Sequence, residues 1–281
     1  MTTTSTGVAA PAADHIDNPA AHDGRLLPAA LRSEWTKLRS VRSTMWALLA
    51  TIGITVGFGS LFCFAYTARY DRLDVAERRT VDPTLLSLRG LFLSALAVGV
   101  LGVLVISAEY ATGMIRATLT AVPQRRVVLA AKAIVFGTVA LTVSFGSAFA
   151  AFGAGQAILA RKHLGTSLTD PTVLRAVVGA AVYLTIVGLL GLALGTILRR
   201  TAGAIATLVG LVFIADLLVE ALPSPWNTDI GKFLPGNAGL ALFSVRHNAD
   251  RLTPGAALAV LLVWLAAALT VATITLTRRD A

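Results

Sequence analysis

Six long stretches of the chain are predominantly apolar and carry no charged side chain. About 20 apolar residues in a helix cross the hydrocarbon core of a bilayer, because a helix rises about 1.5 Å per residue. The stretches lie between Arg42 and Arg69, Arg89 and Glu109, Lys132 and Arg161, Arg175 and Arg199, Arg200 and Asp216, and Arg251 and Arg278. The fifth is short, but apolar character continues through Asp216 to Pro223. Each stretch is therefore long enough to span a membrane.

The stretches also indicate which secondary structure spans the membrane. Lipid offers no hydrogen-bond partner to the backbone, so only helices and closed barrels can cross it. The apolar runs are continuous and lack the period-2 alternation of barrel strands. The pattern predicts an all-α integral membrane protein with a transmembrane domain over residues 43–279. Its six helices are expected near residues 45–66, 88–108, 133–158, 176–198, 202–222 and 254–277.

The segment before the first span, residues 27–42, has the pattern of an amphipathic helix. Its apolar residues recur at helical spacing and form one face: Leu27, Leu31, Trp35, Leu38 and Val41. Basic residues occupy the rest: Arg32, Lys37, Arg39 and Arg42. This pattern is typical of a helix that lies in the membrane plane beside anionic headgroups. Two interpretations remain open, an anchor for the first span alone or an additional contact with a cytoplasmic partner. Residues 1–26 are small and polar and are expected to form a disordered cytoplasmic tail.

The loop between the second and third spans predicts a short helix that projects from the membrane. Met114 or Ile115, with Thr118, Leu119 and Val122, gives it an apolar side. Pro123 ends this helix, and Arg125 and Arg126 begin the next one. A short helix of this kind needs something to pack against.

The outer stretch from Pro223 to Arg251 is too apolar for a free loop. Its large apolar residues need cover: Phe233, Leu234, Leu240, Leu242 and Phe243. We expect one or two short helices that dip into the outer leaflet, where irregular backbone is tolerated only when protein buries it.

Composition supports a membrane protein and argues against a soluble domain and a nucleic-acid-binding protein. Hydrophobic residues make up 56% of the chain and charged residues 14%, whereas soluble domains have roughly 45–50% and about 25%. The net charge of +9 is spread along the span ends rather than gathered on one face, so no nucleic-acid partner is expected. The single cysteine, Cys63, allows neither an intrachain disulfide nor a cysteine-based metal site.

The positions of the basic residues predict that both termini are cytoplasmic. An even number of spans places both termini on one side. With the termini inside, the inner set holds slightly more than half of the 24 Lys and Arg residues: Arg25, Arg32, Lys37, Arg39, Arg42, Arg116, Arg125, Arg126, Lys132, Arg199, Arg200, Arg278 and Arg279. Arg199 and Arg200 fill a loop without an acid, whereas the loop from Arg69 to Arg89 balances its arginines with four acids. The positive-inside rule therefore favours this orientation.

Several motifs resemble those of ABC type-2 transporter permeases, the membrane subunits of ATP-driven exporters. The loop after the second span carries the pattern Glu109-Tyr110-x-x-Gly113-x-x-Arg116, followed by Leu119, Pro123, Arg126, Leu129 and Lys132. The opening LRSEWTKLRSVRSTMWALL is similar to the start of actinobacterial members. The segment from Phe233 to Gly239 resembles the outer, re-entrant segment that precedes their last span. The resemblance covers residues 28–279.

The resemblance implies an ABC type-2 permease fold in the plasma membrane and a division of labour between subunits. A separate P-loop ATPase, expected in two copies, would hold ATP and Mg, and a second permease half, identical or related, would complete the export path. The motifs do not identify the substrate, for which an amphiphilic, drug-like or lipid compound is the hypothesis. Motion of the ATPase would be received by the loop residues Glu109, Tyr110, Gly113, Arg116, Pro123, Arg126 and Lys132 and by the in-plane residues Trp35, Lys37, Arg39 and Arg42.

The chain itself is expected to bind no cofactor. It contains no G-x-x-x-x-G-K-[ST] motif, and its one Gly-Lys pair, Gly231-Lys232, is followed by Phe233 in an outer loop. It therefore cannot hydrolyse ATP by the P-loop route alone.

Glu109 has two interpretations. Its carboxylate could cap the loop helix, where an acid near the N-terminus gains about 0.3–1 kcal/mol. Alternatively, it could pair with Arg116 or with a basic residue of the ATPase. The second interpretation predicts that charge reversal at Glu109 or Arg116 uncouples the partner and leaves membrane insertion intact. For Arg125 and Arg126, anchoring of the third span is the favoured role.

Asp216 is a carboxylate inside a predicted span, with Glu220 one turn later on the same face. Buried intramembrane acids suggest function, and three roles are open: a proton relay, a polar lining of the export path, or carboxylates satisfied locally or by snorkelling. A relay would make the protein an ion- or proton-coupled secondary carrier. The two halves of the chain share no motif, whereas such carriers usually contain an internal repeat.

An intramembrane enzyme is the least favoured alternative. His15 and His22 lie in the tail, and His163 and His247 lie in outer loops, so no histidines converge at one depth. Neither H-E-x-x-H nor G-x-S-x-G occurs. No catalytic residue and no metal site are expected. The pairs Gly53-x-x-x-Gly57 and Gly191-x-x-x-Gly195 are expected to serve ordinary helix packing rather than a dimer seam.

Overall fold

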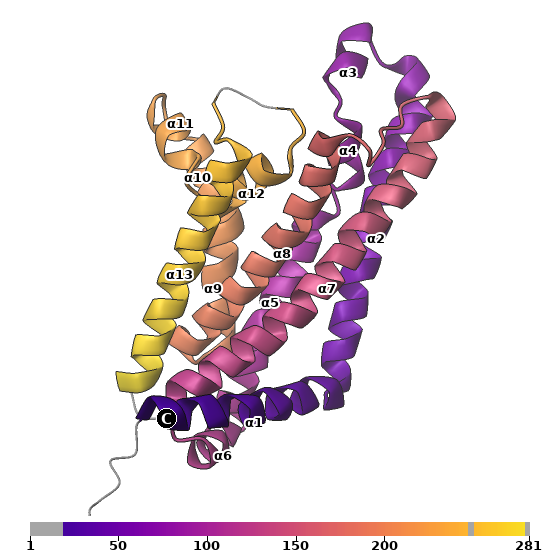
Figure 1. Cartoon of the computed structure of the whole chain (residues 1–281). Helices are drawn as coiled ribbons and strands as arrows, with labels where there is room; N and C mark the ends of the chain where they lie inside the picture. The colour runs from indigo at the N-terminus through magenta and orange to yellow at the C-terminus, as the bar shows by residue number, and fades with distance from the viewer. Residues whose placement is uncertain (1–18, 247–249, 279–281) are drawn as a thin grey trace, which may run out of the picture.

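The computed structural model describes residues 19–246 and 250–278. Its described part contains helices and no strands, arranged as a bundle of long helices with one helix lying across the end of the bundle (Figure 1). The crossing helix is α1 (Pro19–Ser40).

Six helical segments are long and apolar enough to cross a membrane, which indicates a multi-pass membrane protein and confirms the predicted number. Five are single helices: α2 (Arg42–Arg69), α5 (Leu91–Ala111), α7 (Arg125–Leu159), α8 (Pro171–Leu198) and α13 (Pro254–Arg278). The sixth is composite and consists of α9 (Thr201–Val209), a π-helical turn (Gly210–Ile214) and α10 (Ala215–Glu220). The expected span near 202–222 is therefore helical but contains a π turn, which the hydrophobic pattern does not reveal.

Short helices and turns connect the spans. At the end of the bundle away from α1 lie α3 (Val75–Thr80), α4 (Pro83–Ser87), α11 (Trp226–Gly231) and α12 (Pro235–Phe243), with 3-10 turns at Tyr70–Arg72 and Ala160–Lys162. At the opposite end, α6 (Met114–Ala121) lies near α1 (Figure 1). We call these the α4 end and the α1 end. Pro19 and Arg278, the first and last described residues, both lie at the α1 end (Figure 1).

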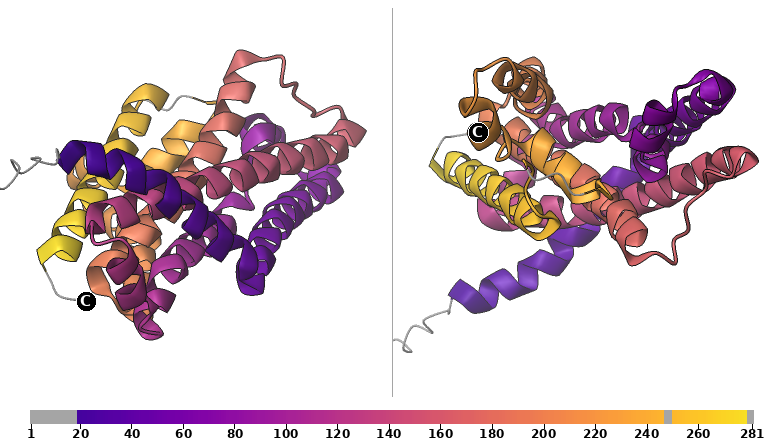
Figure 2. Two further views of the ribbon diagram at one scale, coloured as in Figure 1. Left: turned by 60° about the horizontal axis from the view of Figure 1, so that its bottom comes forward. Right: turned by 90° about the horizontal axis from the view of Figure 1, so that it is seen from above.

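The first helix corrects two expectations. It begins at Pro19 rather than at Leu27, so the expected boundary of the disordered tail at residue 26 is wrong; residues 1–18 of that tail lie outside the described part. It ends at Ser40, because Val41 is extended (φ −87°, ψ 102°), and Arg42 begins α2 instead. As expected, α1 lies across the ends of the spans rather than continuing the first one (Figure 2, left).

The face of α1 that packs on the protein overlaps only in part with the predicted apolar face, through Leu31 and Leu38. Trp35 and Val41 are each 46% exposed, whereas Ala30, Glu34 and Leu38 are buried against the bundle. These three residues are spaced four apart and so share one helical face. An acid therefore lies at the centre of the face that packs on the protein.

The core of the bundle is built around α8, where two glycine-rich helices meet. A Cβ atom at Gly191 of α8 would collide with the carbonyl oxygen of Gly99 on α5, and a Cβ at Gly102 of α5 would collide with the carbonyl oxygen of Gly188. Such close backbone approach is possible only without side chains. This contact fixes the centre around which the other spans pack.

The two glycine pairs of the sequence differ in role. Gly191 and Gly195 pack against α5, at Gly99 and Val103, which confirms the packing interpretation. Gly53 and Gly57 are exposed on α2, and a Cβ at either would meet nothing within 4 Å. The expectation of packing within the chain is wrong for this second pair.

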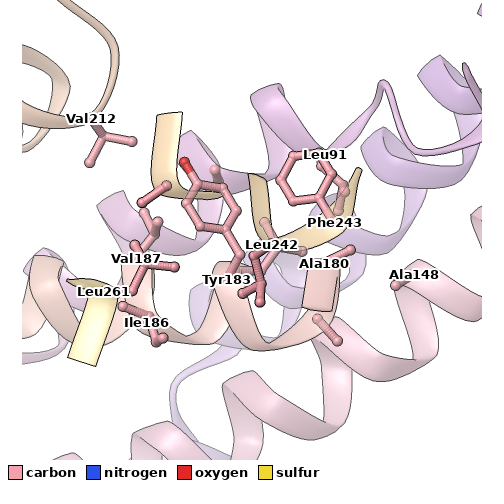
Figure 3. Packing of buried hydrophobic residues seen from close by; sticks show 14 of the residues in the cluster. Leu91, Ala148, Ala180, Tyr183, Ile186, Val187, Val212, Leu242, Phe243 and Leu261 are labelled. Carbon is pink, nitrogen blue, oxygen red and sulfur yellow. The ribbon is translucent and has the colours of Figure 1, made fainter. Parts of the chain in front are cut away.

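The apolar outer stretch forms two short helices, as expected. Leu242 and Phe243 of α12 are buried against α8, where the rings of Tyr183 and Phe243 lie 5.7 Å apart between centroids (Figure 3). Gly239 packs directly on the Tyr183 ring. Phe233 remains 48% exposed. The stretch is thus part of the folded core rather than a free loop.

Candidate functional site

Four charged side chains meet at the α1 end of the bundle. Nζ of Lys132 lies 2.6 Å from Oε2 of Glu34 and 2.9 Å from Oε1 of Glu109. Nζ of Lys37 lies 2.8 Å from Oε1 of Glu34 and 3.0 Å from the same Oε1 of Glu109. We call Glu34, Lys37, Glu109 and Lys132 the charge cluster. Each ammonium thus bridges both carboxylates.

Three helices position the cluster. Glu34 and Lys37 lie one turn apart on α1, Glu109 lies in the last turn of α5, and Lys132 follows the first two turns of α7. The α7 helix begins at Arg125, as predicted from the break at Pro123, so Lys132 projects from inside a continuous helix. The cluster therefore ties the crossing helix to the ends of two spans.

The side chains of the charge cluster are largely shielded from solvent, so their charges must be balanced within the protein. The Lys132 side chain is 2% exposed and that of Lys37 is 29% exposed, while both carboxylates are buried. Isolated buried charges cost several kcal/mol each, so they persist only with good partners. Two ammonium groups and two carboxylates give zero net charge. Burial alone would lower the pKa of Lys37, but hydrogen bonds to, and the charges of, Glu34 and Glu109 outweigh it and raise that pKa above its usual value. Lys37 therefore stays charged at neutral pH.

The cluster also reaches the projecting helix α6. Nζ of Lys37 donates a hydrogen bond to Oγ1 of Thr118 at 3.2 Å. Between α1 and α6 lies a groove of about 280 Å³, lined by Ala30, Ser33, Glu34, Lys37, Met114, Ala117, Thr118, Ala121, Val122 and Val128. Glu34 and Lys37 of the charge cluster line this groove, together with small side chains of both helices.

Arginines at the same end bind neighbouring helix ends. The Arg199 guanidinium lies over the Tyr110 ring, 5.3 Å from its centroid, and Arg199 adopts a left-handed backbone (φ 55°) at the end of α8. Nη1 of Arg125 donates to the carbonyl of Leu276 at 2.8 Å in the last turn of α13. Cations favour helix C-termini, where carbonyls lack backbone partners. These contacts connect the loops at the α1 end into one surface.

The structure brings together only some of the predicted coupling residues. Lys37, Glu109 and Lys132 meet in the charge cluster. The other loop and in-plane residues lie on the surface, apart from the half-buried Tyr110: Trp35, Arg39, Arg42, Gly113, Arg116, Pro123 and Arg126. Gly113 has φ +72° and starts α6, so it serves the turn of the backbone. Pro123 lies in the break between α6 and α7, as expected.

Glu109 has neither of the partners that we expected within the chain. The N-terminus of α6 begins at Gly113 without a side-chain cap, so Glu109 does not cap it. Arg116 is exposed on α6, and the carboxylate binds Lys37 and Lys132 instead. The reason is that Glu109 points into the bundle from the last turn of α5, whereas Arg116 faces outward after the turn at Gly113.

Sequence reasoning missed Glu34. The pattern of residues 27–42 indicates a basic amphipathic helix, and Glu34 is the one acid among its basic residues. Its spacing of three from Lys37 permits a helical ion pair. Lys132 is a second signal of an ion pair, because it directly precedes a long apolar run. A lysine buried beside such a run needs a carboxylate partner. Together these two features could have suggested the pairing.

Asp216 has a local structural role at the α4 end. Its Oδ2 fills the space beside Gly236, where a Cβ would collide with it, and the backbone N–H of Asn237 bonds the carboxylate. These residues form the first turn of α12, where a negative charge is favoured. Glu220 is exposed at the end of α10. The Asp216 carboxylate is thus held at the start of α12 on one side only, because its Oδ1 is buried without a hydrogen-bond partner among the described residues.

Comparison with known proteins adds no relative. No family model matches the chain, and no curated protein matches it. Among the described residues, no group of three or more His, Cys, Asp or Glu side chains could hold a metal ion. The case for function therefore rests on the residues themselves, above all on the charge cluster and the groove beside it.

Proposed function

We propose that the protein is the permease subunit of an ABC type-2 exporter, driven by a separate P-loop ATPase that docks at the α1 end. The observation that carries this proposal is the charge cluster. It joins α1, and through Thr118 the projecting helix α6, to the ends of α5 and α7. In this proposal the α1 end is cytoplasmic, and a second permease half completes a path for an amphiphilic, drug-like or lipid substrate.

The cluster suits transmission of force from a partner. A body that pushes on α6 or α1 moves side chains that are bonded directly to two spans, because Lys37 and Lys132 each bind both carboxylates. Buried ion pairs hold fixed geometry, since separating them leaves uncompensated charge. Displacement of α1 is therefore expected to be passed to α5 and α7 rather than absorbed locally. The exposed residues of α6, including Met114 and Arg116, would form the contact with the ATPase.

The decisive experiment is purification of the tagged full-length chain from its native membrane in a mild detergent. We expect a P-loop ATPase to co-purify in stoichiometric amount and to hydrolyse ATP in the complex. Absence of such an ATPase from repeated preparations of folded protein would contradict the proposal. A matched preparation of an unrelated multi-pass protein identifies ATPases that bind nonspecifically.

The substitution Arg116→Glu is expected to weaken coupling without loss of fold. Arg116 is exposed and bonds no acid among the described residues, so its reversal disturbs no internal pair. We expect the affinity of the ATPase to fall about fivefold, which corresponds to about 1 kcal/mol. The measurement is ATPase bound per permease in a titration, together with the ATPase rate of the complex.

The matched control is Arg161→Glu, an equally exposed arginine at the α4 end, which should leave ATPase binding unchanged. Equal binding by the wild type and the Arg116→Glu variant would contradict docking at α6. The substitution Glu109→Lys, suggested by the sequence as an equivalent test, is unsuited to it. It would place three ammonium groups around Glu34 in a buried site and so destabilise the fold.

A further inference from the structure

The α4 end contains a large pocket that plays no part in the proposed coupling. Its volume is about 820 Å³, and it lies between α2, the segment with α3 and α4, and the residues that follow α12. Its rim and walls carry four arginines, Arg69, Arg89, Arg246 and Arg251. A smaller pocket of about 210 Å³ shares Arg246 and Arg251 and adds Arg175.

Arginines outnumber acids among the described residues that line the pocket. Two carboxylates line it, Glu77 and Asp82, against the four arginines, which leaves a formal charge of +2. Asp82 is engaged in accepting the backbone N–H groups of Thr84 and Leu85. Among the described residues, no ion pair involves Arg69, Arg89 or Arg251.

One acid of the same loop pairs outside the pocket. Oδ2 of Asp71 lies 2.6 Å from Nζ of Lys162 on the neighbouring loop. Of the arginines in this loop, Arg69 and Arg89 line the pocket.

One wall of the pocket is apolar. Phe62, Ala65, Tyr66 and Arg69 follow one another at helical spacing on α2, and Leu85 and Leu86 of α4 face them across the pocket. Phe62 is 38% exposed, and the Arg89 guanidinium lies 5.5 Å from its ring centroid. The apolar wall extends from Arg69 to Phe62, about 10 Å along the helix.

The arginines lie where spans end. Arg69 is the last residue of α2, Arg89 lies two residues before α5, and Arg251 lies just before α13. Span ends coincide with the level of lipid headgroups, and the apolar wall on α2 lies at the level of the acyl chains. The pocket therefore offers both chemistries that an anionic lipid presents, with Arg89 placed beside the apolar wall at Phe62.

We propose that this pocket binds an anionic lipid. The phosphate would lie among Arg69, Arg89 and Arg251, which offer several N–H donors each, and an acyl chain would lie along Phe62, Ala65 and Leu85. Guanidinium groups bind phosphate through paired N–H bonds, and a basic pocket beside spans is a common headgroup site. This binding needs no ATPase, so it is independent of the proposed function.

The test uses the full chain purified in a neutral detergent and analysed by native mass spectrometry. Three probes are titrated: phosphatidylglycerol, phosphatidylcholine and glycerol 3-phosphate. We expect phosphatidylglycerol to bind at least about tenfold more tightly than the other two, because only it combines an acyl chain with a net negative head. Equal binding of phosphatidylcholine would overturn the role of the arginines. Equal binding of glycerol 3-phosphate would overturn the role of the apolar wall.

Variants locate the binding site. The double substitution Arg89→Gln and Arg251→Gln should weaken phosphatidylglycerol binding about tenfold, and Ala65→Trp should weaken it by filling the apolar wall. The control Arg161→Gln removes an exposed arginine at the same end, outside the pocket, and should change nothing. Thermal stability is measured for every variant, so loss of fold is recognised separately. Unchanged binding in both folded pocket variants would overturn the proposal.

Discussion

Replacement of Lys132 by methionine is expected to lower the free energy of unfolding by about 3–5 kcal/mol, the range for breaking a buried ion pair from one side. The ammonium group binds Glu34 at 2.6 Å and Glu109 at 2.9 Å. Methionine has similar length and fills the space, so the loss is electrostatic rather than a cavity. Two buried carboxylates would remain with Lys37 alone. Oε2 of Glu109 already lacks a hydrogen-bond partner among the described residues.

The chain offers a closely matched control in Lys162→Met. Nζ of Lys162 also lies 2.6 Å from a carboxylate oxygen, that of Asp71, but these side chains are 36% and 75% exposed. An exposed pair contributes little to stability, because water solvates both groups when they separate. The residue type, the substitution and the shorter N–O distance are the same, so burial and the second carboxylate partner of Lys132 are the variables that differ. Unfolding in a denaturing detergent, followed by tryptophan fluorescence, measures both variants.

A double-mutant cycle separates pairing from burial. Glu34→Gln alone should destabilise the protein, but in combination with Lys132→Met it should cost less than the sum of the two single losses. Coupling energies of about 0.5–3 kcal/mol are usual for residues that share one network. Two results would contradict buried ion pairing in the charge cluster. One is strict additivity of the two losses in unfolding free energy, and the other is an equal loss from Lys132→Met and Lys162→Met.

The sequence predicts the number of spans because lipid sets one clear requirement. A run of about 20 uncharged, apolar residues has the length that the hydrocarbon core demands of a helix. All six such runs form helical segments long and apolar enough to cross a membrane. The start of α7 is predicted as well, because Pro123 ends the preceding helix and Arg125 begins α7. The uncharged run begins only after Lys132, and the sequence does not show that two carboxylates make this lysine acceptable inside the bundle.

The cluster itself can be predicted only in part. Glu109 and Lys132 stand out in the sequence as charges beside apolar runs, but their partner Glu34 lies on a helix whose packing face cannot be decided from spacing. The apolar residues Trp35 and Val41 point to a different face, and the structure leaves both of them exposed. The protein buries the face with Glu34 because Lys132 on α7 provides a cation there. Long-range pairing of charges places Glu34 in the packing face, whereas hydrophobic periodicity indicates only the part of that face that contains Leu31 and Leu38.

The two glycine motifs also have the same spacing in the sequence but different surroundings in the structure. This difference leads to the second prediction with a large effect on stability. Gly191→Ala should destabilise the protein by about 1–3 kcal/mol, the usual cost of overpacking a filled core. The added methyl group would collide with the carbonyl oxygen of Gly99, which belongs to a rigid helix backbone and cannot rotate away. Helices α5 and α8 must separate to make room, and both lie at the centre of the bundle. Gly102→Ala, at the neighbouring contact with Gly188, should have an effect of similar size.

The control is Gly53→Ala, in the other motif with the same spacing. A methyl group at Gly53 meets nothing within 4 Å, and alanine favours helix over glycine by about 0.5–1 kcal/mol. This variant should therefore match the wild type or slightly exceed its stability. The midpoint of thermal unfolding in a mild detergent ranks the three variants. If Gly53→Ala lost as much stability as Gly191→Ala, close packing of α5 on α8 could not be the cause. The loss would then depend on glycine in any span, irrespective of the neighbouring backbone.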